Sequence, residues 1–167
     1  FGKGVDETVF SDSKTLSFKR RNFIFDTFID AKIQYWTSII RPKTIDRMNI
    51  LKATLKGMGR VISRCSCDVS EILVDGNHVP YSRTKVPVSA IIKGDSFVPE
   101  ISCASIIAKV VRDRLMARLH IRYPLYRFDQ HFGYGTSFHY DAIETYGVLP
   151  HVHRQSFKLF RQPSLSS

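Results

Sequence analysis

The strongest constraint on the fold of this chain is a pair of short apolar segments that each run into an aspartate. The first is "EILVDG", residues 71–76, and the second is "VPVSAIIKGD", residues 86–95. Apolar runs of this length, bounded by glycine, are typical of buried strands. Segments with helical periodicity lie before and after them. Strands separated by helices predict an α/β fold, or an α+β layered fold.

Helical periodicity, with apolar residues three or four positions apart, marks the helical part of the chain. The helical segments are residues 17–35, 44–65, 99–123 and 137–147, and the second of them suits either one helix or a helix pair. Ser17 is a suitable cap, Pro99 stands where a first turn tolerates proline, and Gly147 closes the last helix. The segment "IQYWTSII", residues 33–40, is short and rich in β-branched and aromatic residues, which predicts a further strand.

Length and composition favour one globular domain. A chain of 167 residues can bury most of its apolar surface, so we expect a single domain over residues 1–160 and a disordered polar tail, "RQPSLSS", over residues 161–167. No apolar run approaches the roughly 18 residues of a membrane helix. The chain starts at Phe1 without a basic and apolar leader, and its three cysteines form no zinc pattern. We expect a cytoplasmic monomer with reduced thiols.

The charge of the chain points to a polyanionic partner. Lys and Arg number 25 against 15 Asp and Glu, a net charge of +10. The basic residues are scattered along the chain rather than gathered in one tail, and this favours nucleic acid as the partner. The alternative is a basic protein whose charge serves solubility alone.

Asp75 and Asp95 are the candidate catalytic residues, because each follows a predicted strand. A central strand delivers its last side chain to the sheet edge, where loops build sites. Taken alone, Asp75-Gly76 is better explained as a tight hairpin turn. The recurrence of a strand-terminal acid in a basic chain instead suggests oxygen ligands for Mg²⁺ or Mn²⁺ against a phosphate backbone. Two ions roughly 4 Å apart normally need further carboxylates.

Two other polar groups of residues are less specific. Ser102, Ser105, Lys109 and Arg112 form one polar stripe at helical spacing, which is either a solvated face or a phosphate-binding face. The strings "DQHFGYGTSFH" and "HVHRQSF" supply a tyrosine, an arginine and several histidines. These are His131, Tyr134, His139, His151, His153 and Arg154. Ordinary histidines in a surface turn explain them, and the spacing does not favour a zinc site, so a histidine-based metal enzyme is the weakest hypothesis.

Several strings together resemble one family, ribonuclease HII. They are "SDSKTLS", "IDRMNILKAT", "ILVDGN", "IIKGDSFVPEISCASIIAKVVRD", "HFGYGTSFH" and "HRQSF", in this order. The resemblance runs from about Ser11 to Phe157. It implies a ribonuclease-H-like mixed sheet flanked by helices, with a C-terminal helical extension. It also implies two-metal-ion cleavage of RNA in RNA/DNA hybrids and at single ribonucleotides in duplex DNA, leaving 3′-hydroxyl and 5′-phosphate ends.

The resemblance also assigns roles to single residues. Asp75 and Asp95 match two of the four metal-binding acids of the family, and Tyr134 matches the tyrosine that stacks on the sugar beside the scissile junction. Further positions match residues that meet phosphates or frame the site, namely Lys14, Asn77, Ser102, Lys109 and Arg154. The family usually has a lysine where this chain has Phe132, which puts one phosphate contact in question.

The remaining two acids of the family are an adjacent Asp-Glu pair in an Asp-Glu-x-Gly-Arg-Gly motif. Asp6 and Glu7 imitate this pair, but "TVFSDSK" follows them in place of the glycine-rich turn. The four residues 8–11 span at most roughly 14 Å, too little for the strands that follow the pair in the family. We therefore expect that the first strands are not in this chain, whether it is a fragment, an excerpt or a truncated gene product. An open sheet edge and weak or absent activity would follow.

The main alternative function is a noncatalytic nucleic-acid-binding domain. Such a domain would keep the basic surface and Tyr134 without turnover. Both hypotheses predict an affinity that falls steeply with salt, because the contacts would be made largely to phosphates. They differ in metal-dependent cleavage, which only the enzyme would show.

Overall fold

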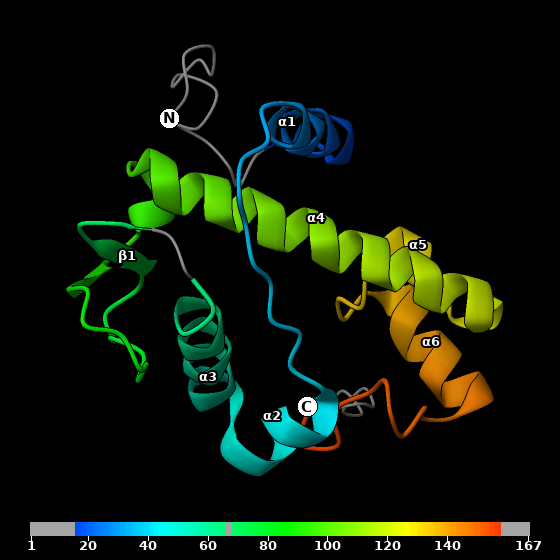
Figure 1. The fold of residues 1–167 in the computed structure, drawn as a ribbon. Helices are drawn as coiled ribbons and strands as arrows, with labels where there is room; N and C mark the ends of the chain where they lie inside the picture. The colour runs from blue at the N-terminus through cyan, green and yellow to red at the C-terminus, as the bar shows by residue number, and fades with distance from the viewer. Residues whose placement is uncertain (1–15, 66–67, 158–167) are drawn as a thin grey trace, which may run out of the picture. The chain divides into compact units, whose positions relative to one another are not determined.

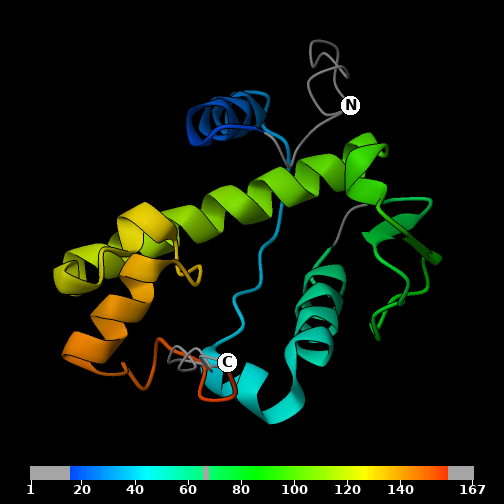
Figure 2. The same cartoon turned by 180° about the vertical axis from the view of Figure 1, so that it is seen from behind.

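The computed structural model describes residues 16–65 and 68–157 (Figures 1 and 2). Helices dominate the described residues, and two short strands form a parallel sheet. The predicted α/β class is confirmed. Over the same residues, none of the helices combines the length and the apolar character that a membrane span requires. Lys14, Asp6, Glu7 and the tail over residues 161–167 lie outside the described residues.

The chain forms two compact units. The first unit comprises residues 1–39 and 54–111, and the second comprises residues 40–53 and 112–167. Helix α4, Pro99–Arg122, contributes its first half to the first unit and its second half to the second (Figure 1). Each unit has its own apolar core and is described by itself. The single domain over residues 1–160 remains a prediction.

The core of the first unit lies between α1, Phe18–Asp30, and the first half of α4. As predicted, Ser17 caps α1, because its hydroxyl accepts a hydrogen bond from the Arg20 amide at 3.3 Å. The core residues recur at helical spacing on both helices, and Figures 1 and 2 show α1 beside α4. They are Ile24, Phe25, Phe28, Cys103, Ile106, Ile107 and Val110. Burial raises the pKa of the Cys103 thiol to about 12, so this free cysteine stays protonated.

The two strands appear where the sequence predicts them. Strand β1, Ile72–Asp75, pairs in parallel with β2, Val88–Ile91. The prediction that both are buried is wrong for most of their residues, because only Val74 is buried and β2 is half-buried throughout. A central strand needs layers on both faces, and the described residues supply this two-stranded sheet with only partial cover.

The strand predicted over residues 33–40 is wrong, because this segment has no regular secondary structure. Its first residues are held by helix α1 instead. The Ile33 amide donates to the Phe28 carbonyl at 3.0 Å, and the Tyr35 ring meets Phe25 edge-on, 5.7 Å between centroids. The preference of β-branched and aromatic residues for strands reflects packing against a neighbouring strand. In this segment Ile33 and Tyr35 contact helix α1 instead.

For residues 44–65, where the sequence suits either one helix or a helix pair, the structure shows the pair. Helix α2, Pro42–Met48, ends at Asn49, whose φ of 68° breaks the helix, and α3, Ile50–Ile62, follows. The Asn49 side chain then accepts from the Lys52 amide at 3.0 Å, which caps α3. Further along α3, in the first unit, Gly59 lies against the backbone of Tyr81: a Cβ at this glycine would stand 2.1 Å from the Tyr81 carbonyl oxygen.

The second unit is built around Tyr126, which ends the short helix η3, Pro124–Tyr126. Its ring stacks on Phe128 at 5.6 Å, and its hydroxyl donates to the Gly147 carbonyl at 2.8 Å. Phe128 begins α5, Phe128–His131. Helix α6, Ser137–Tyr146, adds Ala142 and Ile143 to this core and ends at Gly147 as predicted. Its N-terminus is capped by Thr136.

The C-terminal described segment is tied to α2 by one carboxylate. Asp46 accepts hydrogen bonds from the Gln155 amide at 3.0 Å and from the Ser156 amide and hydroxyl at 2.9 and 2.6 Å. The hydrogen bond from the Ser156 hydroxyl is the main reason that the pKa of Asp46 is lowered. This contact joins the sequence motifs "IDRM" and "HRQSF" within the second unit.

Candidate functional site

Asp75 is the last residue of β1, and its side chain is exposed. The strand ladder fixes it, since Asp75 is paired with Ile91 in the parallel register and the Gly76 amide donates to the Ile91 carbonyl at 2.9 Å. A hairpin turn at Asp75-Gly76 is excluded between these strands, because a two-residue turn joins antiparallel neighbours only. The strand-terminal position expected from the sequence is therefore confirmed for Asp75.

Asp95 lies beyond the end of its strand rather than at it. Strand β2 ends at Ile91, and Asp95 is the central residue of the short helix η2, Gly94–Ser96. Its residue is only 6% exposed. Lys93 adopts a left-handed conformation, and a Cβ at Gly94 would stand 2.5 Å from Ile101 of α4, so close packing determines this turn. The sequence pattern did not reveal this turn, because its backbone conformation depends on α4.

The two aspartates belong to neighbouring elements, because η2 lies in contact with β1. Carboxylate oxygens are the ligands that Mg²⁺ and Mn²⁺ prefer, so the donor set fits a divalent ion of this type. Among residues 16–65 and 68–157, however, no group of three or more His, Cys, Asp or Glu side chains is placed to hold a metal. Asp75 and Asp95 therefore fit as part of a ligand set.

The other candidate residues of the first unit lie near these elements along the chain. Asn77 follows β1 and is exposed, with its side chain in contact with the His78 ring. Ser102 is 1% exposed, while Lys109 is half-buried. The interpretation of the polar stripe of α4 as a solvated face is therefore wrong for Ser102, which packs inside the first unit.

Tyr134 lies in the second unit, in the turn between α5 and α6. Its residue is 54% exposed. The guanidinium of Arg112, from α4, stands over its ring at 4.7 Å from the centroid. An exposed aromatic face beside a cation suits stacking on a sugar or base next to a phosphate.

Arg154 also belongs to the second unit and is half-buried. Its guanidinium stands 4.7 Å from the centroid of the Phe157 ring, and its charge contributes to the lowered pKa of Asp46. The predicted site residues are thus divided: Asp75, Asn77, Asp95, Ser102 and Lys109 belong to the first unit, and Tyr134 and Arg154 to the second.

A family model described as ribonuclease HII matches residues 4–160. The chain belongs to the ribonuclease HII family. It is 45% identical over 152 residues to a ribonuclease HII of Nitrosospira multiformis, covering 91% of this chain and 75% of that protein. It is 43% identical over 155 residues to that of Ralstonia nicotianae, covering 91% of this chain and 64% of that protein.

Solved structures support the ribonuclease HII fold. The structure of this chain is similar to that of ribonuclease H2 from Pyrococcus horikoshii, with a TM-score of 0.69 at 23% sequence identity. The match covers 92% of this chain and 79% of the other. The ribonuclease-H-like fold predicted from the sequence is therefore confirmed.

This ribonuclease HII chain also contains a buried histidine cluster, which we define as His131, His139 and His153. Their residues are 5%, 7% and 5% exposed. The rings of His131 and His139 stack at 4.2 Å, and Nε2 of His139 lies 3.2 Å from Nε2 of His153. Burial lowers the pKa of all three, that of His153 to about 4. The predicted surface turn is wrong for these three residues. Their burial depends on packing against Tyr126 and Phe128, which spacing alone did not reveal.

Proposed function

We propose that this chain carries the chemistry of an endoribonuclease that cleaves the RNA strand of RNA/DNA hybrids and single ribonucleotides embedded in duplex DNA. The cleavage would leave 3′-hydroxyl and 5′-phosphate ends and would serve ribonucleotide excision in the cytoplasm, with the protein as a monomer. The observation that carries the proposal is the pair Asp75 and Asp95 on two adjacent elements of a ribonuclease HII chain.

Asp75 and Asp95 would hold Mg²⁺ or Mn²⁺ as part of their ligand set. When bound, two such ions supply the Lewis-acid chemistry of phosphodiester hydrolysis, so that no general-base side chain is required. Two carboxylates are fewer than a site for two ions normally uses. We therefore expect residues 1–167 alone to cleave weakly or not at all.

The remaining candidate residues would bind and orient the duplex. Tyr134 offers an exposed ring for stacking on the sugar at the ribonucleotide, beside the charge of Arg112. Lys14, Asn77, Ser102, Lys109 and Arg154 would meet phosphates or frame the site, as the family resemblance implies. The net charge of +10 supports binding to a polyanionic backbone.

A second candidate function is a noncatalytic nucleic-acid-binding domain. It is favoured by one observation, the exposed Tyr134 ring beside Arg112 in a strongly basic chain. These residues suffice for binding through stacking and phosphate contacts, without any metal ligand.

The deciding experiment uses an end-labelled DNA duplex with one ribonucleotide and an all-deoxy duplex of the same sequence. Both are incubated with this chain, and separately with this chain joined to first strands that carry the Asp-Glu-x-Gly-Arg-Gly motif of the family, in Mg²⁺, Mn²⁺ or EDTA. We expect metal-dependent cleavage of the first duplex alone by the extended protein, with a 3′-hydroxyl end. Binding without cleavage by both proteins would favour the noncatalytic domain instead.

A further inference from the structure

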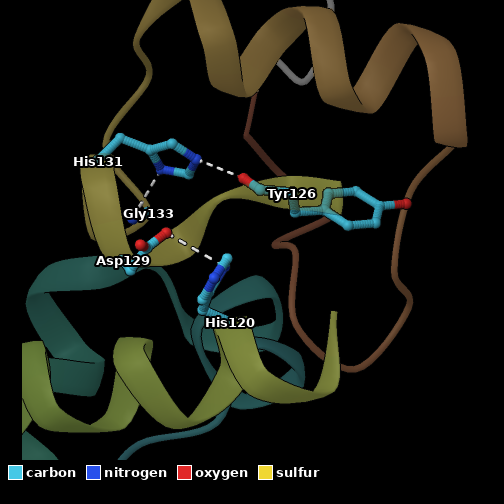
Figure 3. Close-up of polar contacts among 5 residues, drawn as sticks. All are labelled: His120, Tyr126, Asp129, His131 and Gly133. Atoms are coloured by element: carbon cyan, nitrogen blue, oxygen red, sulfur yellow. Dashed lines mark hydrogen bonds and ion pairs between the residues drawn. The ribbon is translucent and has the colours of Figure 1, made fainter. Parts of the chain in front are cut away.

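The turn that carries Tyr134 is held from the protein side by buried histidine rings. Phe132 and Gly133 both adopt left-handed conformations, with φ of 47° and 77°. The Gly133 amide donates a hydrogen bond to Nδ1 of His131 at 3.1 Å (Figure 3). One residue later, the Tyr134 carbonyl lies 3.0 Å from Nδ1 of His139. Two histidines therefore hold the peptide groups on either side of the one that joins Gly133 to Tyr134.

The backbone partners determine which ring nitrogens carry protons. The Gly133 amide can only donate, so Nδ1 of His131 must accept and its proton lies on Nε2, which donates to the Tyr126 carbonyl at 2.7 Å (Figure 3). The Leu149 amide likewise donates to Nδ1 of His153 at 2.9 Å. The proton of His153 therefore also lies on Nε2.

The third histidine takes the opposite tautomer. The Tyr134 carbonyl can only accept, so Nδ1 of His139 carries the proton. Its Nε2 is then free to accept from Nε2–H of His153, at 3.2 Å. With these three neutral tautomers every ring nitrogen of the cluster has a hydrogen-bond partner of the matching type. The hydrogen bond from His153 fixes the orientation of the His139 ring.

A second proton would break this arrangement at any of the three rings. A second proton on His131 would place its Nδ1–H against the N–H of Gly133, and one on His153 would place its Nδ1–H against the N–H of Leu149. A second proton on His139 would place its Nε2–H against the Nε2–H of His153. The charge of Asp129, two residues before His131, acts on the His131 ring, but its carboxylate is paired with His120 at 3.1 Å (Figure 3). Arg112 stands over the Tyr134 ring from α4. Burial also lowers the pKa of the three rings.

We propose that His131, His139 and His153 are positioning residues that, in their neutral tautomers, lock the Gly133-Tyr134 turn and so present the Tyr134 ring to the ribonucleotide. This inference rests on the proposed function for its substrate. The histidines touch no substrate: they act through the two peptide groups that they hold.

The first test is independent of any nucleic acid. Two-bond nitrogen–proton correlation spectra of the full chain at pH 7.5 identify the tautomer of each histidine. We expect an Nε2–H tautomer for His131 and His153 and an Nδ1–H tautomer for His139, together with slow exchange of the Gly133 amide. A charged ring, or the opposite tautomer at His139, would overturn the proposal.

The second test separates positioning from folding with matched substitutions. His139→Asn keeps an N–H donor near the Tyr134 carbonyl, His139→Leu removes it, and His151→Asn is the control at an exposed histidine outside the cluster. Each variant is titrated with a duplex that contains one ribonucleotide and with an all-deoxy duplex. The ratio of the two dissociation constants measures recognition of the 2′-hydroxyl.

We expect His139→Leu to reduce this ratio by about threefold to tenfold, the effect of roughly one hydrogen bond, while its affinity for the all-deoxy duplex is unchanged. His139→Asn should retain most of the ratio, and His151→Asn all of it. Equal ratios for wild type and His139→Leu, or a His139→Asn that behaves like His139→Leu, would contradict the proposal. If the wild type binds the two duplexes equally, the proposed function fails. The measured histidine tautomers and the exchange rate of the Gly133 amide then still test whether the histidines hold the turn.

Discussion

The two units hold their candidate functional residues by different physical means. In the first, Asp75 and Asp95 are set by the backbone: a parallel strand ladder fixes one, and a tight turn packed against α4 fixes the other. In the second, Tyr134 is set by side chains, since neutral histidines bind the turn on which it lies. The first arrangement should therefore be sensitive to steric changes, and the second to protonation.

The largest expected effect concerns the acids of the first unit. Asp75→Asn and Asp95→Asn each remove a negative charge from the metal ligand set without changing volume, so we expect loss of cleavage by about 10²-fold or more with duplex binding preserved. The measurement is single-turnover cleavage of the ribonucleotide-containing duplex by this chain joined to first strands that carry the Asp-Glu motif of the family. Asp68→Asn, at an exposed acid of the same unit, is the control and should cleave normally. Full activity in both site variants would remove these acids from the mechanism.

The next effect tests the steric sensitivity of the first unit. Gly59→Ala would place a Cβ 2.1 Å from the Tyr81 carbonyl oxygen, which is backbone and cannot rotate away. We expect a loss of about 1–3 kcal/mol in the free energy of unfolding, the usual effect of overpacking. Urea denaturation measures it, with Arg60→Ala at the adjacent exposed position as the control. A Gly59→Ala variant as stable as Arg60→Ala would show that α3 and the backbone at Tyr81 can move apart to admit the methyl group.

The third prediction concerns pH and the second unit. Burial lowers the pKa of His131, His139 and His153 below the ordinary histidine value of 6.5. The unfolded chain therefore binds more protons than the folded chain when the pH falls below 6.5. The stabilisation is complete above pH 6.5 and is lost progressively as the pH falls toward about 4, the pKa of His153.

We expect this loss in the free energy of unfolding to reach at least about 1 kcal/mol, because a pKa lowered from 6.5 to about 4 at His153 alone is worth more than that. Amide exchange at pH 7.5 and pH 5, followed by residue, should show α6 losing protection before α1. A replacement of His153 by Gln should weaken this dependence on pH. Equal acid sensitivity of α1 and α6 would contradict the contrast between the two units.

The smallest effect tests an exposed contact of the second unit. Asp46→Asn should weaken the three hydrogen bonds that the carboxylate accepts from residues 155 and 156 and so speed the exchange of these two amides. Since the pKa of Asp46 is lowered, its contribution to stability is present above the ordinary aspartate value of 3.8 and disappears as the pH falls through the pKa of the folded state. Asp30→Asn on α1 is the control. Unchanged exchange at both amides would show that the carboxylate does not hold this segment.

Much of the fold could be predicted because its signals are local. Ser17 and Gly147 mark helix boundaries through their own side chains or backbone freedom, and Pro99 marks the first turn of α4, where proline is tolerated. The strand predicted over residues 33–40 failed for the opposite reason. Its β-branched and aromatic residues pack on α1, and composition cannot tell a neighbouring helix from a neighbouring strand.

The candidate site shows the same division. Asp75 and Asp95 could be found because a carboxylate at the end of an apolar run is visible in the sequence, and the family resemblance names both of them and Tyr134 as well. The histidine cluster was missed, because His131, His139 and His153 come together only when α5, α6 and the segment before Arg154 pack around Tyr126 and Phe128.

The sequence by itself determined the longer helices, the two strands of the sheet, the basic charge and membership of the ribonuclease HII family, because each depends on residue type and spacing along the chain. Only the tertiary structure decided that Asp95 lies in a buried turn and that three histidines are neutral and linked. Burial and hydrogen-bond partners set both properties, and they are supplied by residues distant in sequence.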